Sequence, residues 1–180
     1  DRYIQLINDC MKEERMFGMI QPKSKKGLVP EVYEIGCLGK IISFNETTDK
    51  RFVISLSGII RFRIIKEVNE DKLYRKFYVD YSEFMKDLDK EKNQISNNEK
   101  EILLHKIKIF FQKLNYPIDH EELMKLDSDD LINTVCMISP FSVEEKQKLI
   151  ETREIGHKIK LLDEIINFNL IEYQENKTIQ

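Results

Sequence analysis

β-Branched and aromatic residues dominate several stretches in the first half of the chain, a pattern that predicts β-strands. Strands are expected over residues 16–20, 32–44, 51–56, 59–66 and 77–84. Polar stretches at 45–50 and 69–72 predict the turns between them. Short connections of this kind favour an antiparallel meander that curls into a small barrel-like lobe.

One face of the central strands is expected to form the core of this lobe. Along residues 52–56 and 60–64 the apolar side chains share one face, while Arg61 and Arg63 take the other. Three glycines interrupt these apolar runs, and in a curling sheet they are expected at bulges or at close backbone approaches. They are Gly36, Gly39 and Gly58.

The apolar period changes to about 3.6 in the second half of the chain, which predicts helices there. Longer helices are expected over 102–114 and 152–170. A short amphipathic helix is also expected at the start of the chain, over residues 3–11. Asp127 or Ser128 can cap a helix ending at Ile138, and Ser142 opens a capping box before another. The fold class is therefore α+β, with a strand-rich barrel lobe over 1–84, a polar linker over 85–97 and a helical bundle lobe over 98–180.

Composition narrows the class of function. The 180 residues are 41% hydrophobic and 34% charged, which fits a globular protein, and the formal net charge is -3. Nucleic acid is disfavoured as the main partner because no global positive field is present. No apolar run reaches the roughly 20 residues of a membrane span, so a cytoplasmic location is expected. The three cysteines lack metal-site or disulfide spacing and are expected to be buried thiols.

Motifs for catalysis are missing from the sequence. It has no phosphate-binding loop, no dinucleotide-binding glycine pattern and no nucleophile turn. Residues 119–122 include metal-ligand types, but their spacing favours a solvated helix start. His105 and His157 stand alone. We therefore expect no catalytic residue, no metal and no cofactor.

Two other classes of function stay open at this point. An RNA-binding barrel would require one basic face formed by Lys23, Lys25, Lys26, Arg51, Arg61 and Arg63. A small enzyme would require Cys37, which lies between two glycines, to meet a histidine brought close by folding.

Five short motifs, taken in order, carry a resemblance to a known family. They are Arg2-Tyr3, Arg15-x-Phe17-Gly18, Gly36-Cys37-Leu38-Gly39-Lys40-Ile41, Gly58-Ile59-Ile60-Arg61-Phe62 and Glu144-Glu145-Lys146-Gln147-x-Leu149-Ile150-Glu151. This order resembles the N-terminal, substrate-binding domain of Lon-type ATP-dependent proteases, over nearly the whole chain. The resemblance implies a PUA-like barrel followed by a helical bundle. It also implies structural roles for Arg2, Tyr3, Gly18, Gly36, Gly39, Gly58, Arg61 and Phe62.

The sequence departs from the family pattern in three places. It begins at Asp1, after the position of the family's first apolar strand, so one barrel strand is expected to lie upstream. Asp49-Lys50-Arg51 lacks the glycine that relatives often have there, which predicts a looser hairpin. The ATPase and protease modules of full-length Lon are not in the chain, and the polar segment 172–180 favours a stand-alone form of the domain.

The resemblance implies a non-catalytic module that binds unfolded or degron-bearing polypeptide, with a protease or chaperone as a further partner. Such a module needs exposed apolar side chains framed by polar ones. The residues expected to bind peptide are Phe17, Met19, Ile20, Val32, Tyr33 and Ile35, flanked by Arg61 and Arg63. The alternative for each apolar residue is a place in the core, and for each arginine an ion pair on the barrel surface.

Overall fold

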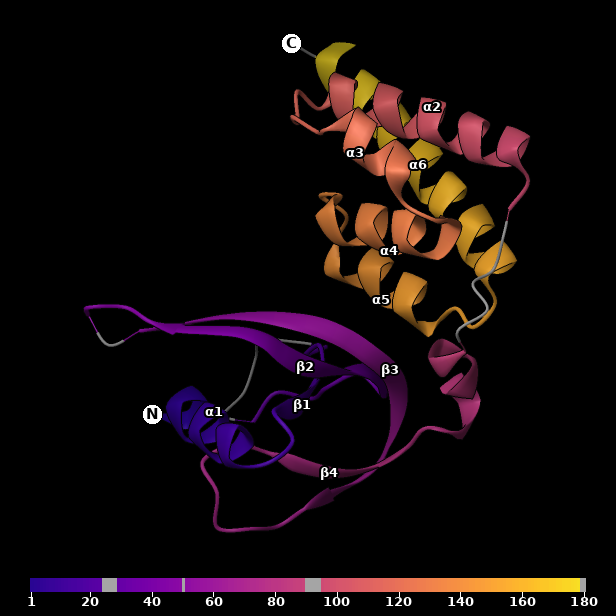
Figure 1. Ribbon diagram of the computed structural model, residues 1–180. Coiled ribbons are helices and arrows are strands. Elements are labelled where there is room, and N and C mark those ends of the chain that lie inside the picture. Colours follow the sequence, from indigo (N-terminus) through magenta and orange to yellow (C-terminus); the bar gives the residue numbers. More distant parts are fainter. Residues whose placement is uncertain (24–28, 50, 90–94, 179–180) are drawn as a thin grey trace. The chain divides into compact units, whose positions relative to one another are not determined.

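The structure, a computed structural model, describes residues 1–23, 29–49, 51–89 and 95–178 (Figure 1). The chain divides into two compact units, Asp1–Asp89 and Lys90–Gln180. The first unit contains all the strands of the described residues, and the second is helical. This arrangement confirms the α+β class. The first unit ends later than residue 84, because the segment that follows the last strand packs on the sheet.

One antiparallel sheet forms the first unit. Its strands are β1 (Met16–Met19), β2 (Ile35–Glu46), β3 (Phe52–Val68) and β4 (Lys76–Asp80), paired in the order β1-β2-β3-β4. Helix α1 (Arg2–Lys12) precedes the sheet, and a 3-10 helix, η1 (Ser82–Leu88), follows it. Figure 1 shows β3 as a long, strongly curved strand, which gives the sheet its barrel-like curl. Within the described residues β1 and β4 remain the two edge strands.

The separate strands expected over 51–56 and 59–66 are one strand, β3, so that prediction is wrong. Gly58 lies inside β3 opposite Gly39, and the register shifts between Leu38 and Gly39. A β-bulge forms at this position, and the pairing of β2 with β3 continues beyond it. The sequence therefore identified a bulge site, and the strand break inferred from it does not occur.

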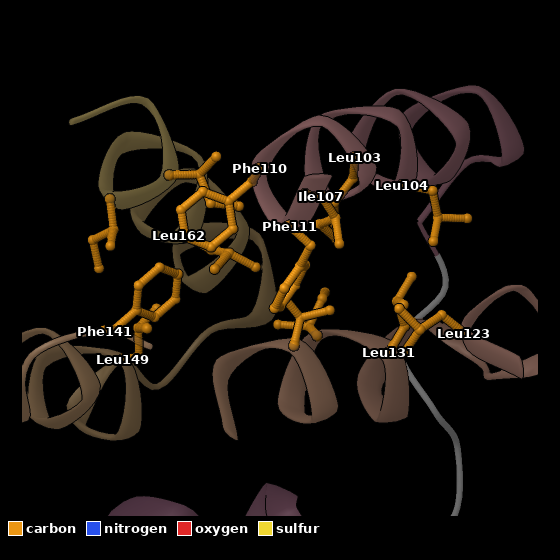
Figure 2. Close-up of a cluster of buried hydrophobic side chains, with 14 residues drawn as sticks. Leu103, Leu104, Ile107, Phe110, Phe111, Leu123, Leu131, Phe141, Leu149 and Leu162 are labelled. Carbon is orange, nitrogen blue, oxygen red and sulfur yellow. The ribbon is translucent and has the colours of Figure 1, made fainter. Parts of the chain in front are cut away.

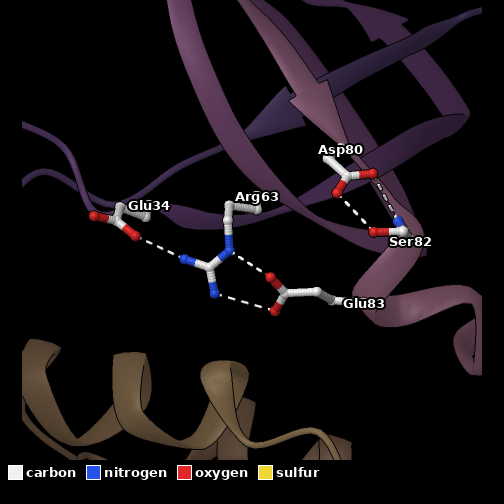
Figure 3. Close-up of polar contacts among 5 residues, drawn as sticks. All are labelled: Glu34, Arg63, Asp80, Ser82 and Glu83. Carbon is white, nitrogen blue, oxygen red and sulfur yellow. Dashed lines mark hydrogen bonds and ion pairs between the residues drawn. The ribbon is translucent and has the colours of Figure 1, made fainter.

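The strand expected over 77–84 is also shorter in the structure, because β4 ends at Asp80. The Asp80 carboxylate accepts hydrogen bonds from the Ser82 N–H at 3.0 Å and from the Ser82 hydroxyl at 2.6 Å (Figure 3). These bonds turn the chain and lower the pKa of Asp80. The apolar residue that suggested a longer strand, Phe84, lies in η1 and is 1% exposed.

The interior of the first unit depends on close packing against glycine. A Cβ atom built on Gly36 would lie 2.7 Å from Phe62 Cζ and 2.5 Å from the Met19 carbonyl oxygen. A Cβ built on Gly18 would lie 3.0 Å from the same Phe62 atom. The aromatic ring thus occupies the space that side chains from two neighbouring strands would need. A close backbone approach, one of the two roles expected for the glycines, is found at Gly36.

In its described residues, the second unit consists of five helices: α2 (Asn97–Lys113), α3 (His120–Lys125), α4 (Ser128–Ile138), α5 (Val143–Glu151) and α6 (Ile155–Thr178). Figure 2 shows side chains from several of these helices meeting in one apolar core. Ile107, Phe110 and Phe111 on α2 are fully buried there. Because all the residues of this core belong to the second unit, that unit has its own source of stability.

Local capping explains where these helices begin. Asp127 caps α4 by accepting a bond from the Asp130 N–H, and Ser142 and Glu145 form the expected capping box of α5. A second capping box, Ser96 with Glu99, starts α2 at Asn97, earlier than residue 102. The Ser-x-x-Glu pattern that predicts it is present in the sequence but lies within a highly polar stretch.

Candidate functional site

Strand β1 presents its two faces to different surroundings. A side chain at position 18 would point toward the Phe62 ring in the interior. Because successive strand residues point to opposite faces, Phe17 and Met19 project from the outer face. Phe17 is half-buried, whereas Met19 is 54% exposed. We call Phe17 and Met19 the β1 strip.

The β1 strip continues across the sheet as a row of three side chains. Met19 lies opposite Cys37 on β2, and Cys37 lies opposite Arg61 on β3. Directly opposed residues of antiparallel strands share a face, so these three side chains lie on the same side of the sheet. The row therefore begins at an exposed methionine and ends at an arginine that η1 covers.

Arg61 holds η1 against the sheet. Its guanidinium donates to both carboxylate oxygens of Asp87, at 2.7 and 2.8 Å, and its backbone N–H donates to the same carboxylate at 3.0 Å. The guanidinium carbon lies 4.5 Å from the centre of the Phe84 ring. The arginine side chain is only 11% exposed. This arrangement gives Arg61 a structural role, in line with its place in the family motif, and leaves little of it accessible to a peptide.

Arg63 is also held by acidic side chains. Its guanidinium donates to Glu83 at 2.6 and 3.1 Å and to Glu34 at 2.7 Å (Figure 3). The hydrogen bonds from Arg63 to Glu83 raise the pKa of the arginine above its usual value. Both arginines thus adopt the alternative considered for them, ion pairs on the sheet surface.

The other apolar residues expected to bind peptide differ in their placement. Ile35 is 4% exposed and packs with Ile60 and Phe84, so its expected place on a binding surface is wrong. Ile20 reaches inward, with its Cδ1 2.7 Å from a Cβ built on Gly36. Ile35 is buried because Phe84 of η1, which lies far along the chain, packs in the same cluster.

Val32 and Tyr33 lie on a short extension of the β1–β2 pairing. Val32 bridges Pro22, and the Tyr33 N–H donates to the Gln21 carbonyl at 2.9 Å. Both residues are half-buried. They flank the β1 strip along the same strand pair and stay candidates for peptide contact, with less accessible surface than Met19.

The first family motif lies at the start of α1 and is exposed. Arg2 donates to the Tyr3 hydroxyl at 3.2 Å, and its guanidinium stacks 4.8 Å from the centre of the tyrosine ring. Tyr3 is among the exposed large apolar residues. This pair therefore contributes little to the core, and its expected structural role is limited to local stacking.

Sequence reasoning missed the contacts that hold α1 to the loop between β3 and β4. Gln5 Oε1 accepts the Leu73 N–H at 2.8 Å. Asp9 accepts hydrogen bonds from Lys72 Nζ at 2.9 Å and from the Tyr74 hydroxyl at 3.0 Å. The bonds from Lys72 and Tyr74 lower the pKa of Asp9. These partners lie far apart in the sequence, so no local pattern indicates that they meet. The sequence shows only that polar residues flank the apolar face of the helix.

The surroundings of Cys37 do not support a nucleophilic thiol. Burial raises the pKa of its thiol above the usual value of 9.0, so the protonated form dominates at neutral pH. All three histidines of the chain, His105, His120 and His157, belong to the second unit, so the unit that contains Cys37 supplies no imidazole base. Within the described residues, no group of three His, Cys, Asp or Glu side chains could hold a metal ion.

A basic face for RNA also lacks support in the described residues. Lys23 pairs with Glu31 at 3.0 Å and Arg51 with Asp49 at 2.6 Å, in addition to the pairs of Arg61 and Arg63. Lys25 and Lys26 lie outside the described residues. Because the described members of the proposed basic set are paired with carboxylates, little positive charge remains to attract phosphates.

Comparison with known proteins identifies first the fold and then the family of this chain. The fold is that of a Lon N-terminal domain protein from Xanthomonas campestris (TM-score 0.64, 16% identity, 89% of this chain and 82% of that one). It is also that of the N-terminal domain of the Mycobacterium avium complex Lon protease (TM-score 0.61, 14% identity, 93% and 86%). The pattern that defines the ATP-dependent protease La (LON) substrate-binding domain matches residues 1–167. The chain belongs to this family.

The relatives in this family are much longer than the chain. Lon protease of Syntrophus aciditrophicus is 24% identical over 186 residues, which cover 94% of this chain and 22% of the relative. The chain thus spans about a fifth of the length of the curated Lon proteases that it matches, and it corresponds to their substrate-binding domain. In the described residues, no helix has both the length and the apolar character needed to cross a membrane.

Proposed function

We propose that this chain binds unfolded or degron-bearing segments of other polypeptides and performs no chemistry on them. The observation that carries this proposal is the β1 strip, where Met19 is 54% exposed beside Phe17 on the outer face of β1. Membership in a family defined as a substrate-binding domain supports it. A protease that acts on the bound segment is the expected partner, and the cytoplasm is the expected location.

The binding should be weak for any one segment. A disordered partner loses about 1 kcal/mol or more of conformational free energy per ordered backbone residue. The β1 strip offers only two apolar side chains to offset this cost, with Val32 and Tyr33 adding partly covered surface. Dissociation constants in the micromolar range or above are expected. Weak binding suits a module that must accept many sequences and release them.

Apolar burial, and not charge, should supply the affinity. Arg61 and Arg63, the two arginines expected to flank the binding surface, already pair with carboxylates of the same unit. Added salt screens exposed charge pairs but leaves apolar burial intact. Binding should therefore persist at ~0.3 M salt, where an interaction that depends on phosphate or carboxylate contacts would weaken strongly.

The experiment is a titration of a fluorescent, apolar-rich unfolded peptide with the wild type and with a Phe17→Ser, Met19→Ser variant. The variant should bind about tenfold more weakly. The single variant Met19→Ser changes only an exposed residue, so it replaces the double variant in the titration if the double variant folds poorly. Ile42→Ser is the matched control, because Ile42 is 66% exposed and lies outside the strip. Absence of wild-type binding, or equal binding by all the variants, contradicts the proposal.

A further inference from the structure

Arg15 differs from the other arginines of the first unit in its surroundings. Four of them pair with carboxylates at 2.6 or 2.7 Å, namely Arg51, Arg61, Arg63 and Arg75. Arg2 stacks on the ring of Tyr3. Arg15 is exposed, and its side chain makes no hydrogen bond or ion pair with the part of the chain that the structure describes. Its guanidinium is therefore available to a ligand.

The backbone at Arg15 lies in the left-handed region, with a φ of 57°. This conformation is disfavoured for a residue with a Cβ atom, whereas glycine adopts it freely. The turn joins α1 to β1: the Arg15 N–H donates to the Cys10 carbonyl at 3.0 Å, and the Arg15 carbonyl accepts from the Ile41 N–H at 2.8 Å. The connection explains the left-handed backbone but not the choice of arginine, so a role of the side chain outside the fold is the reason we consider.

Arg15 lies next to the β1 strip. It directly precedes β1, and its bond with Ile41 extends the pairing of β1 with β2 by one residue. Residues two apart along a strand are about 7 Å apart, so Arg15 lies about 7 Å from Phe17 along the chain and twice as far from Met19. A long arginine side chain can therefore reach a ligand that contacts the strip.

The charges at this end of β1 favour an anionic group. Lys40, opposite Met16 on β2, is exposed and forms no ion pair with any described residue. Glu13 and Glu14 precede Arg15 in the chain, and neither forms an ion pair with it. Beyond the other end of the strip, the next cation along the chain, Lys23, is paired with Glu31 at 3.0 Å. The unpaired positive charge thus lies at the Arg15 end.

We propose that the β1 strip binds an apolar polypeptide segment that carries an Asp or Glu residue, and that Arg15 binds its carboxylate. This inference rests on the proposed function and names the class of segment that the same site selects. A guanidinium can donate two parallel hydrogen bonds to a carboxylate. Because Arg15 is two residues from Phe17 and four from Met19, the acidic residue should lie at a similar spacing from the apolar residues of the segment.

An internal acidic side chain is the expected source of the carboxylate. An unfolded polypeptide offers many such side chains but only one C-terminus. Apolar burial still supplies most of the affinity, and an exposed charge pair adds about a three- to fivefold preference for the acidic segment. Screening weakens exposed pairs, so this preference should decrease at ~0.3 M salt while apolar binding persists.

Three fluorescent peptides with the same apolar core test the ligand. One has Glu near the core and an amidated C-terminus, the second has Gln in its place, and the third combines Gln with a free C-terminus. The Glu peptide should bind about three- to fivefold more tightly than the two Gln peptides. Equal binding by all three, or a preference for the free C-terminus alone, overturns the inference. If no peptide binds, the proposed function itself is contradicted.

Arg15→Gly separates ligand binding from folding. Glycine removes the guanidinium and relieves the left-handed strain, which offsets the greater freedom of the unfolded chain, so the urea midpoint should stay near that of the wild type. The variant should nevertheless bind the Glu peptide about three- to fivefold more weakly, and no better than the Gln peptide. A preference for Glu that persists in Arg15→Gly overturns the inference. So does a markedly lower midpoint, because the arginine would then serve the fold.

A matched pair of variants separates the site from net charge. Arg15→Gln and Arg51→Gln each remove one positive charge, and the Arg51 side chain is 80% exposed and paired with Asp49. Arg15→Gln should abolish the preference for the Glu peptide, whereas Arg51→Gln should change it less than about twofold. Equal loss in the two variants would show that overall charge attracts the peptide, and would overturn the assignment to Arg15.

Discussion

The ring of Phe62 occupies the space in which a side chain at position 36 would lie, so the position of this ring requires glycine at residue 36. A Cβ on Gly36 would be 2.7 Å from Phe62 Cζ, and it would also meet the Met19 carbonyl oxygen at 2.5 Å. Gly18 packs on the same ring from β1. Residues from three strands thus form one packing unit directly beneath the β1 strip, which fixes the strand that carries it.

We expect Gly36→Ala to destabilise the first unit by about 1–3 kcal/mol, because the added methyl group forces the ring or the β1 backbone to shift. Gly58→Ala is the matched control in the same sheet, since its Cβ would meet only Cys37 Sγ, at an ordinary 3.5 Å. Urea unfolding of the two variants measures the difference. Equal midpoints for the two variants would show that the ring adapts without cost.

The Arg61–Asp87 pair should be important for the stability of the first unit. Asp87→Ala leaves a largely covered guanidinium without its carboxylate, and a loss of about 2 kcal/mol is expected. Glu70→Ala removes a more exposed partner, that of Lys76, and should cost less than about 1 kcal/mol. Urea unfolding monitored on the sheet compares the two. A larger effect of Glu70→Ala would contradict the structural role of Arg61.

The attachment of α1 should depend on the charge of Asp9. Because its pKa is lowered below the usual 3.8, the stabilisation from Lys72 and Tyr74 is present above that pH and lost as pH falls through the lower value in the folded state. Asp9→Asn should make the α1 amides exchange faster at neutral pH. Glu13→Gln, an exposed change at the end of the helix, is the control. Unchanged exchange in Asp9→Asn would mean that the apolar face alone holds α1.

Cys136 should be unreactive at neutral pH. Burial raises the pKa of its thiol to about 11, so at pH 7 only ~1 in 10⁴ molecules carries the thiolate. Alkylation followed by mass spectrometry should be slow in the native chain, accelerate as pH approaches the pKa, and reach the rate of a free thiol once urea unfolds the protein. Fast native labelling of Cys136 would contradict this prediction, and fast labelling of Cys37 would revive the cysteine-dependent alternative.

Local signals in the sequence predicted the helical unit well. The caps at Asp127 and Ser142 depend on side chains within three residues of the groups that they satisfy, so the sequence contains the whole interaction. The end of β4 was missed because two local signals compete there. An apolar run favours a longer strand, while Asp80 and Ser82 form a turn that prevails.

The candidate site was less predictable because its burial depends on distant segments. Asp87 and Glu83 are separated from Arg61 and Arg63 by 26 and 20 residues, and nothing in the arginine strand indicates these partners. Ile35 is similarly covered by η1, which sequence reasoning assigned to a strand and a linker. Met19 and Phe17 could be placed on one face from alternation alone, but which face is outer is set by the packing of Gly18 on Phe62.

Photo-crosslinking tests the central claim, binding of polypeptide at β1, most directly. An unfolded peptide that contains benzophenone, which reacts well with methionine, is irradiated with the intact chain, and the adducts are mapped by mass spectrometry. The chain offers a built-in competition, because Met85, Met124 and Met137 are 54%, 54% and 70% exposed, against 54% for Met19. We expect adducts to concentrate on Met19 and its neighbours in β1 and to disappear with excess unlabelled peptide. Adducts spread over the four methionines according to exposure, or concentrated in the helical unit, would contradict binding at β1.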